Sequence, residues 1–273
     1  MNGTSKNISV VIPAYNMGDM IGAAIESVDR TSVEGDEVIV VDDGSEDSTA
    51  SVVQGYAEED KLGVDLRFYR QENRGKSNAV NRGFREARGN YVSILDADDQ
   101  IAEGGLDVLF RNRLDETGTP YPMVVGGFEV FNRSGEFGCR VPPLGYSPEQ
   151  LRARFYLHWK TPFHLNACLL SRDLVGKVGG FDERLQRCVD GDYALRLLDA
   201  VDRVNVIDKV VYRYRKHRSS PLNRARYRVE TARYRPQVIW KNYRGWRRWW
   251  GVPFGLAMDA GKLVYELVDY YKK

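Results

Sequence analysis

Cysteine is scarce in this 273-residue chain, which contains only Cys139, Cys168 and Cys188. An odd number of cysteines without C-x-x-C spacing argues against a disulfide framework and against a zinc ribbon. Long apolar runs are also missing. The first run, residues 8–12, is too short for a signal peptide, and no run reaches the roughly 18 residues of a membrane span. These absences predict a protein of the reducing cytoplasm.

Net charge is small as well, at +2 from 40 Lys and Arg against 38 Asp and Glu. The charges are unevenly placed, because residues 213–250 contain 13 of the basic residues and a single acidic residue, Glu230. That segment carries about +12, and the rest of the chain carries about −10. The asymmetry predicts an acidic body and a basic C-terminal region with separate roles.

Short apolar runs alternate with helical stretches along the first 115 residues. Unbroken, β-branched runs are typical of strands buried on both faces. Their alternation with helices predicts an α/β fold with a mainly parallel sheet flanked by helices. The predicted strands are residues 8–12, 37–41, 66–69 and 91–95, and the predicted helices are residues 20–30, 48–59 and 76–88. Beyond residue 120 we expect a strand at 124–131, a helix at 190–201 and short strands at 204–207 and 210–214.

Polar residues follow three of the predicted strands. They are Pro13-Ala14-Tyr15-Asn16, Asp42-Asp43-Gly44-Ser45 and Asp96-Ala97-Asp98-Asp99. Ligands of parallel sheets bind beyond the carboxyl ends of the strands. Carboxylates gathered at such an edge repel one another, which implies a cation or a shared proton. An Asp-x-Asp pair offers hard oxygen ligands to Mg²⁺ or Mn²⁺ and leaves coordination sites for a diphosphate.

Two other phosphate-binding motifs are excluded. Gly75-Lys76-Ser77 has the form of the end of a P-loop, but the glycine that this loop needs five residues earlier is replaced by Arg70. No G-x-G-x-x-G motif opens a helix, which excludes a dinucleotide-binding dehydrogenase.

Seven motifs together resemble the family 2 glycosyltransferases of the GT-A fold, in order and in spacing. Those of the first half are VVIPAYN at 10–16, VDDGSEDST at 41–49, ENRGKSNAVNRG at 72–83 and GNYVSILDADD at 89–99. Those of the second half are GGFDERL at 179–185, VDGDYALRL at 189–197 and YRYRKH at 212–217. The resemblance implies a GT-A (Rossmann-like) catalytic domain at residues 1–220. Its nucleotide-sugar half would be about 1–118 and its acceptor half about 119–220.

The resemblance also implies roles for particular residues. Asp190 would be the catalytic base, Asp98 the main metal ligand, and Asp96 a second ligand or a contact to ribose or a metal-bound water. His217 would complete the metal shell, although an exposed histidine among arginines is an equally good reading. The residues that would bind the nucleotide sugar are Pro13, Tyr15, Asn16, Asp42, Asp43, Asn73, Gly75, Lys76, Asp96 and Ala97.

Two positions depart from the family pattern. Val189 stands where members mostly have Glu, and Val80 stands where they commonly have Arg. Lys76 or Arg82 would then supply the missing positive charge near the nucleotide. His158 and His164 lie outside the motifs and are expected to be structural, and Trp159 and Phe163 are expected to pack rather than to bind sugar.

The function implied by the resemblance is inverting, Mn²⁺- or Mg²⁺-dependent transfer from a nucleotide sugar, most simply a UDP-sugar. The acceptor would be a hydroxyl of a glycan, a lipid-linked sugar or a protein. One alternative is a non-catalytic relative that binds nucleotide sugar or glycan. Another is an Mg²⁺-dependent phosphotransferase, which would need a nucleophilic Asp at the first strand end, where this chain has Pro13-Ala14-Tyr15-Asn16.

Residues 221–273 are expected to form a basic, aromatic-rich helical extension. Three roles remain open for it: attachment to an anionic membrane at the inner face of the cell membrane, packing against the acidic body, and, less favoured, nucleic-acid binding. After Pro253, an apolar stripe at helical spacing would also suit a homodimer contact. The stripe consists of Leu256, Ala260, Leu263, Val264, Leu267 and Tyr271.

Overall fold

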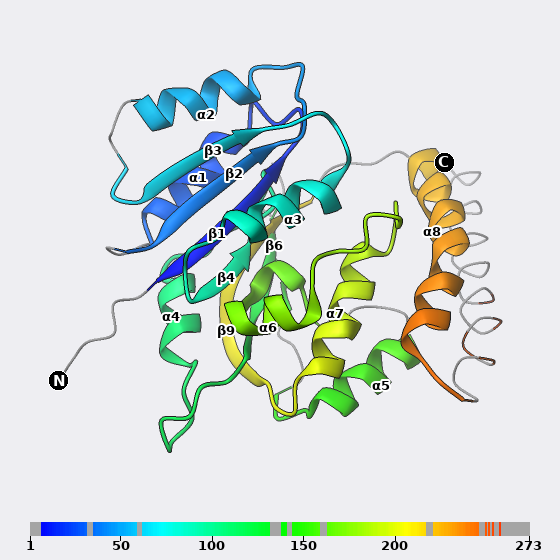
Figure 1. Ribbon diagram of the computed structural model, residues 1–273. Helices are drawn as coiled ribbons and strands as arrows, with labels where there is room; N and C mark the ends of the chain where they lie inside the picture. Colours follow the sequence, from blue (N-terminus) through cyan, green and yellow to red (C-terminus); the bar gives the residue numbers. More distant parts are fainter. Residues whose placement is uncertain are drawn as a thin grey trace.

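The first half of the chain forms four parallel strands with helices between them (Figure 1). The computed structural model describes residues 7–31, 35–58, 62–131, 138–140, 144–158, 163–216, 221–245, 249, 251, 253 and 257. Each of the seven elements predicted here is confirmed, with ends that differ by a few residues. They are β1 (Ile8–Ala14), α1 (Ile21–Asp29), β2 (Glu37–Asp42), α2 (Thr49–Glu58), β3 (Asp65–Arg70), α3 (Lys76–Glu86) and β4 (Tyr91–Ile94).

The second half extends the same sheet, in the order β3-β2-β1-β4-β8-β6-β9-β5 with β7 paired to β6. Strand β8 is antiparallel to both β4 and β6, whereas β6 and β9 are parallel. The elements are β5 (Gln100–Ile101), α4 (Gly105–Arg111), β6 (Met123–Phe131), β7 (Gly138–Arg140), α5 (Pro148–His158), the 3₁₀ turn η1 (Leu165–Ala167), β8 (Cys168–Ser171), α6 (Arg172–Val178), α7 (Val189–Ala200), β9 (Asn205–Arg215) and α8 (Pro221–Asn242).

The prediction of two short strands near residues 204–214 is wrong, because β9 is continuous there. Asp208 and Lys209, which interrupt the apolar pattern, are exposed at an irregularity where β9 has more residues than its partner β6. The bulge accommodates the polar residues without ending the strand. The predicted strand at 124–131 and helix at 190–201 are confirmed as β6 and α7.

Hydrophobic cores lie on both faces of the sheet, which is why β1 is buried along its whole length. Ile8, Val10 and Ile12 pack with α1 in one core, and Val11 packs with α3 and α7 in the other. Helix α3 approaches the sheet closely at Gly83, where a Cβ atom would lie 2.2 Å from Val11 Cγ1.

Helix α8 packs beside α5 and α7 through a third core (Figure 1). Val238, Ile239 and Tyr243 from this region are at most 2% exposed and contact Phe155 and Leu195. Packing of this part of the extension against the body is therefore observed. Among the described helices, none has the length and apolar character needed to cross a membrane.

Candidate active site

The loops that follow β1 and β2 are joined by hydrogen bonds at one edge of the sheet. The backbone N–H of Asp43 donates to the carbonyl of Ala14 (2.8 Å), and that of Asn16 donates to Ser45 Oγ (2.9 Å). Strand β4 lies on the other side of β1 and ends at the same edge. The three polar strand ends of the sequence therefore meet around the end of β1.

Asp43 is buried under the loop that follows β3. Its carboxylate accepts hydrogen bonds from Gln71 Nε2 (2.8 Å) and from the backbone N–H groups of Arg74 (3.0 Å) and Gly75 (2.7 Å). Gly75 has φ of 89°, in the left-handed region that favours glycine. Asp43 thus shapes this loop, and Asn73 is exposed on it.

Two other predicted ligand residues are engaged in the turns themselves. Asp42 is fully buried, accepts the N–H of Ser45 (3.0 Å) and pairs with Arg70 Nε (3.3 Å). Asn16 has φ of 52° and its Oδ1 accepts the N–H of Glu46 (2.9 Å). Both side chains therefore stabilise the loops that form the site.

At the end of β1, the ring of Tyr15 is available to a ligand. Tyr15 is 44% exposed, whereas Pro13 and Ala14 are buried within the strand. An exposed aromatic ring at this strand end is suited to stacking on a nucleotide base.

Lys76, the first residue of α3, pairs with the first Asp of the Asp-x-Asp motif. Its Nζ lies 2.7 Å from Asp96 Oδ1, and the two side chains are 39% and 24% exposed. Burial lowers the pKa of Lys76, but the charges of Asp96, Asp190 and Asp98 outweigh burial and raise it overall. Burial raises the pKa of Asp96, but Lys76 outweighs it, so this carboxyl has a lowered pKa.

The Asp-x-Asp motif and the next residue form a group of carboxylates suited to a divalent cation. Oxygens of Asp96, Asp98 and Asp99 lie within 4.8 Å of one another, and Ala97 between them is buried. The Asp96 carboxylate is held by Lys76 Nζ, which lies 2.7 Å from Oδ1 and 2.9 Å from Oδ2. These hard oxygen ligands fit Mg²⁺ or Mn²⁺, with Asp96 and Asp98 as the residues that would hold it.

Asp99 is the buried member of this group, and its hydrogen-bond donors come from β9. It accepts hydrogen bonds from the Tyr212 hydroxyl and from the N–H of Arg215 (2.6 Å). Burial, followed by the charge of Asp98, raises the pKa of Asp99 to about 7. Arg215 Nε also donates to the carbonyl of Asp98 (2.8 Å), which fixes the backbone of the motif. The sequence predicts Asp99 as one of the clustered carboxylates, but not its partners, which lie more than 110 residues away.

Asp190 lies in the first turn of α7 and is exposed. Its charge acts on both Lys76 and His164, so the expected base lies beside the acidic strand ends. Val189, which replaces the family's Glu, is half-buried and packs against two of the cores. An apolar residue is therefore accommodated where a second carboxylate would otherwise stand.

Lys76, rather than Arg82, provides the cation at this site. Arg82 donates to the carbonyl of Arg70 (2.8 Å) and lies over the Tyr69 ring. Val80, where the family commonly has Arg, is fully buried in the core. The replacement at position 80 thus coincides with a lysine at position 76.

His164 lies at the site, although no motif included it. Its ring packs against Phe128, Tyr212 and Tyr214, with ring centres 4.8–5.5 Å apart. Burial lowers its pKa, while the charges of Asp96 and Asp190 act in the opposite direction. Its Nδ1 is buried and has no hydrogen-bond partner among the described residues. In the sequence, the only indication of a role for His164 was its position just before the apolar residues of η1 and β8.

Several predicted residues cannot be placed. His217 and Trp159 lie outside the described residues, as do all six residues of the apolar stripe after Pro253. Phe163 is 3% exposed and belongs to the core, as expected.

The sheet order and the acidic strand ends are those of the GT-A fold, and solved structures of this fold align with the chain. S. aureus TarS 1–349 in complex with UDP-GlcNAc gives a TM-score of 0.63 at 20% identity, covering 96% of this chain and 71% of that one. The mannosyltransferase PcManGT from Pyrobaculum calidifontis, in complex with GDP-Man and Mn²⁺, gives 0.62 at 22% identity, covering 97% and 76%. At such identities the likeness concerns the fold.

The sequence comparison gives the family. The model of glycosyl transferase family 2 matches residues 9–178, so the chain belongs to this family and is a glycosyltransferase. It is 28% identical over 222 residues to the uncharacterized glycosyltransferase EpsJ of Bacillus subtilis, covering 78% of this chain and 62% of that protein. It is 27% identical over 240 residues to glycosyltransferase GlyG of Streptococcus pneumoniae, covering 84% and 77%. The match thus spans less than two thirds of EpsJ.

Proposed function

We propose that this glycosyltransferase moves a sugar from a UDP-sugar to an acceptor hydroxyl, with a divalent metal and with inversion of the anomeric carbon. The acceptor belongs to a glycan, a lipid-linked sugar or a protein. The observation that carries the proposal is the meeting of Lys76, Asp96, Asp98 and Asp190, which come from α3, the end of β4 and α7.

The donor half supplies groups for a nucleoside diphosphate. Tyr15 would stack on the base beside the loop that Asp43 holds. Lys76 begins α3, so its charge adds to the positive end of the helix dipole where the diphosphate would lie. A divalent cation on Asp96 and Asp98 would neutralise charge on the leaving diphosphate.

The acceptor half supplies the base. Asp190 would take the proton from the acceptor hydroxyl as that oxygen attacks the anomeric carbon from the face opposite the diphosphate. A single displacement of this kind inverts the configuration and needs no second carboxylate as nucleophile.

A donor screen tests the proposal. The purified protein would be incubated with UDP- and GDP-sugars and Mn²⁺ or Mg²⁺, while nucleoside diphosphate release and the thermal shift are followed. Release and stabilisation with one donor class are expected. Stabilisation without any turnover would favour a non-catalytic binding protein, and no response to any donor would refute the proposal.

We also propose that the enzyme is cytoplasmic and associates with an anionic membrane that carries its acceptor. Support comes from exposed aromatic side chains in the basic region: Tyr227 is 56% exposed, Trp240 44% and Trp249 69%. Rings among cations suit the headgroup zone. We expect the protein to sediment with anionic vesicles, and less of it to do so at high salt. The double variant Trp240→Ala/Trp249→Ala should sediment less than the wild type. Equal sedimentation with neutral vesicles, or self-association of the protein in place of vesicle binding, would contradict the proposed membrane association.

A further inference from the structure

Helix α8 holds the segment that carries Asp190 on both sides of that residue. Tyr234 Oη donates to Gln186 Oε1 (3.0 Å), and Glu230 accepts from Arg187 (2.7 Å). The Sγ of Cys188 contacts the Thr231 carbonyl (3.9 Å). After Asp190, the next contact to α8 is made by Asp192.

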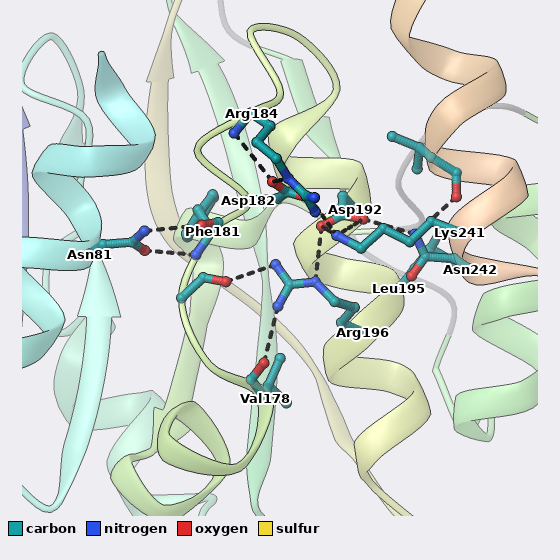
Figure 2. A network of polar contacts seen from close by, with 12 residues as sticks. Asn81, Val178, Phe181, Asp182, Arg184, Asp192, Leu195, Arg196, Lys241 and Asn242 are labelled. Carbon is teal, nitrogen blue, oxygen red and sulfur yellow. Dashed lines mark hydrogen bonds and ion pairs between the residues drawn. The ribbon is translucent and has the colours of Figure 1, made fainter. Parts of the chain in front are cut away.

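Asp192 is the main anchor, because it is a fully buried carboxylate with two partners from α8 (Figure 2). Lys241 Nζ lies 3.1 Å from this carboxylate, and Asn242 Nδ2 donates to Oδ1 (2.8 Å). Arg196, one turn along α7, donates to Oδ2 (2.9 Å). A buried carboxylate needs such partners, so removal of one leaves the charge less compensated.

Lys241 also connects α8 to the loop before α7. Its Nζ lies 2.8 Å from Asp182 Oδ2, so one ammonium group joins two carboxylates ten residues apart (Figure 2). Arg196 closes the same loop by donating to the carbonyls of Val178 (3.1 Å) and Gly180 (2.8 Å).

The donor half reaches this loop from its other side. Asn81 of α3 accepts the N–H of Phe181 (2.6 Å) and donates to its carbonyl (3.0 Å). Helix α3 begins with Lys76, the cation that pairs with Asp96. A continuous set of contacts therefore runs from the donor site through the 181–182 loop to α8 and Asp192.

The link from Asp192 to the base is short. The N–H of Asp192 donates to the carbonyl of Cys188 (3.0 Å), which closes the turn that contains Asp190. Gly191 lies between the two carboxylates, and a Cβ there would be 3.1 Å from the Phe155 ring. The turn is thus held by α5 on one side and by α8 at Asp192.

We propose that Lys241 and Asn242 are positioning residues that fix the Asp190 turn for proton transfer. The extension is then part of the catalytic apparatus. This inference rests on the proposed function for its kinetic consequence, while its structural claim can be tested without a donor.

The first test is amide hydrogen exchange of the full-length protein, without ligand. Lys241→Met and Asn242→Ala should raise exchange at residues 187–193 at least several-fold, whereas Lys241→Arg should stay near wild type. Arg244→Met removes one exposed charge just after α8 and is the matched control. Asn242→Ala keeps the Lys241 ion pair, so it provides a folded variant if Lys241→Met does not fold. Unchanged exchange at 187–193 in Asn242→Ala and in any folded Lys241→Met protein would overturn the proposal.

The second test uses the donor that the screen identifies. A 1 Å displacement of a catalytic group can cost about 10²-fold in rate, so we expect kcat to fall about 10- to 100-fold with little change in donor KM. A raised donor KM with unchanged kcat would overturn the positioning role. If no donor is found, the proposed function fails while the exchange result still decides the structural claim.

Discussion

At the residue scale, the site depends on one cation placed among carboxylates. Lys76 offsets the repulsion that Asp96, Asp98 and Asp190 would otherwise exert on one another in a partly buried setting. The same cation is available to a diphosphate. A substrate that brings its own negative charge would therefore meet a site that already contains a partner for it.

Asp190→Asn should remove the base without disturbing the fold. Because Asp190 is exposed, its replacement should change the free energy of unfolding by no more than about 0.5 kcal/mol. We expect kcat to fall about 10²- to 10⁴-fold, measured by nucleoside diphosphate release in the presence of acceptor. Asp202→Asn, an exposed acid just after α7, is the control, and full activity of Asp190→Asn would refute the assignment.

Tyr193→Phe should keep or raise stability. Tyr193 is fully buried, and its ring stacks on that of Phe181 with the ring centres 4.4 Å apart. Its hydroxyl has no hydrogen-bond partner among the described residues. Removing it should leave the free energy of unfolding unchanged or raise it by up to about 1 kcal/mol in urea denaturation.

Tyr212→Phe is the matched comparison, because the Tyr212 hydroxyl bonds Asp99 and Asn166. Its loss should cost about 1–3 kcal/mol. The opposite ranking of the two variants would show that the hydrogen-bond assignment is wrong.

Residues in local motifs were predictable, and residues that act through the fold were not. Asp43, Asp96 and Asp98 stand directly after strands, where topology alone places a ligand. Asp99 stands in the same run, but its hydrogen-bond donors lie on β9, and His164 comes from the segment before β8. No local pattern encodes those pairings.

At the element scale, the predictable part is the run of βαβ units. Its strands are short and mostly apolar, with β3 as the more polar exception, and single helices separate them, so period and connection agree. The second half was harder to predict because β5 and β8 are very short and α5 has no single apolar face. Its strand order, β8-β6-β9-β5, depends on long-range pairing.

Close packing of α3 on β1 gives an element-scale prediction. Gly83→Ala would place a Cβ against Val11 and should lower the free energy of unfolding by about 1–3 kcal/mol in urea. Gly55→Ala in α2, which would meet no atom within 4 Å, should instead gain about 0.5–1 kcal/mol. Equal effects at the two positions would contradict the described helix–sheet contact.

At the scale of the whole molecule, the near-neutral net charge is the sum of an acidic body and a basic C-terminal region, and the two are in contact. The basic C-terminal region faces acids of the body, as in the pairs of Lys241 with Asp182 and Asp192. Helix α8 also contributes buried apolar side chains to the third core. The composition predicted the asymmetry, but only the packing shows that this part of the extension is built into the body.

Truncation after residue 220 should therefore destabilise the protein. Loss of buried Val238, Ile239 and Tyr243 should remove several kcal/mol, since each buried apolar side chain contributes about 1.5–3 kcal/mol. We expect a lower Tm or insoluble protein, measured by circular dichroism and soluble yield. Truncation after residue 257, which keeps every described contact, is the control. If the protein truncated after residue 220 were as stable as the wild type, the described packing of α8 would be contradicted.

The central claim is metal-dependent transfer from a nucleotide sugar, and release of nucleoside diphosphate with and without EDTA tests it most directly. With the donor from the screen, the claim predicts release that EDTA abolishes and that added Mn²⁺ or Mg²⁺ restores. Asp98→Asn should lack most of this activity at any metal concentration. Release that continues in EDTA, or an Asp98→Asn enzyme as active as wild type, would contradict the claim.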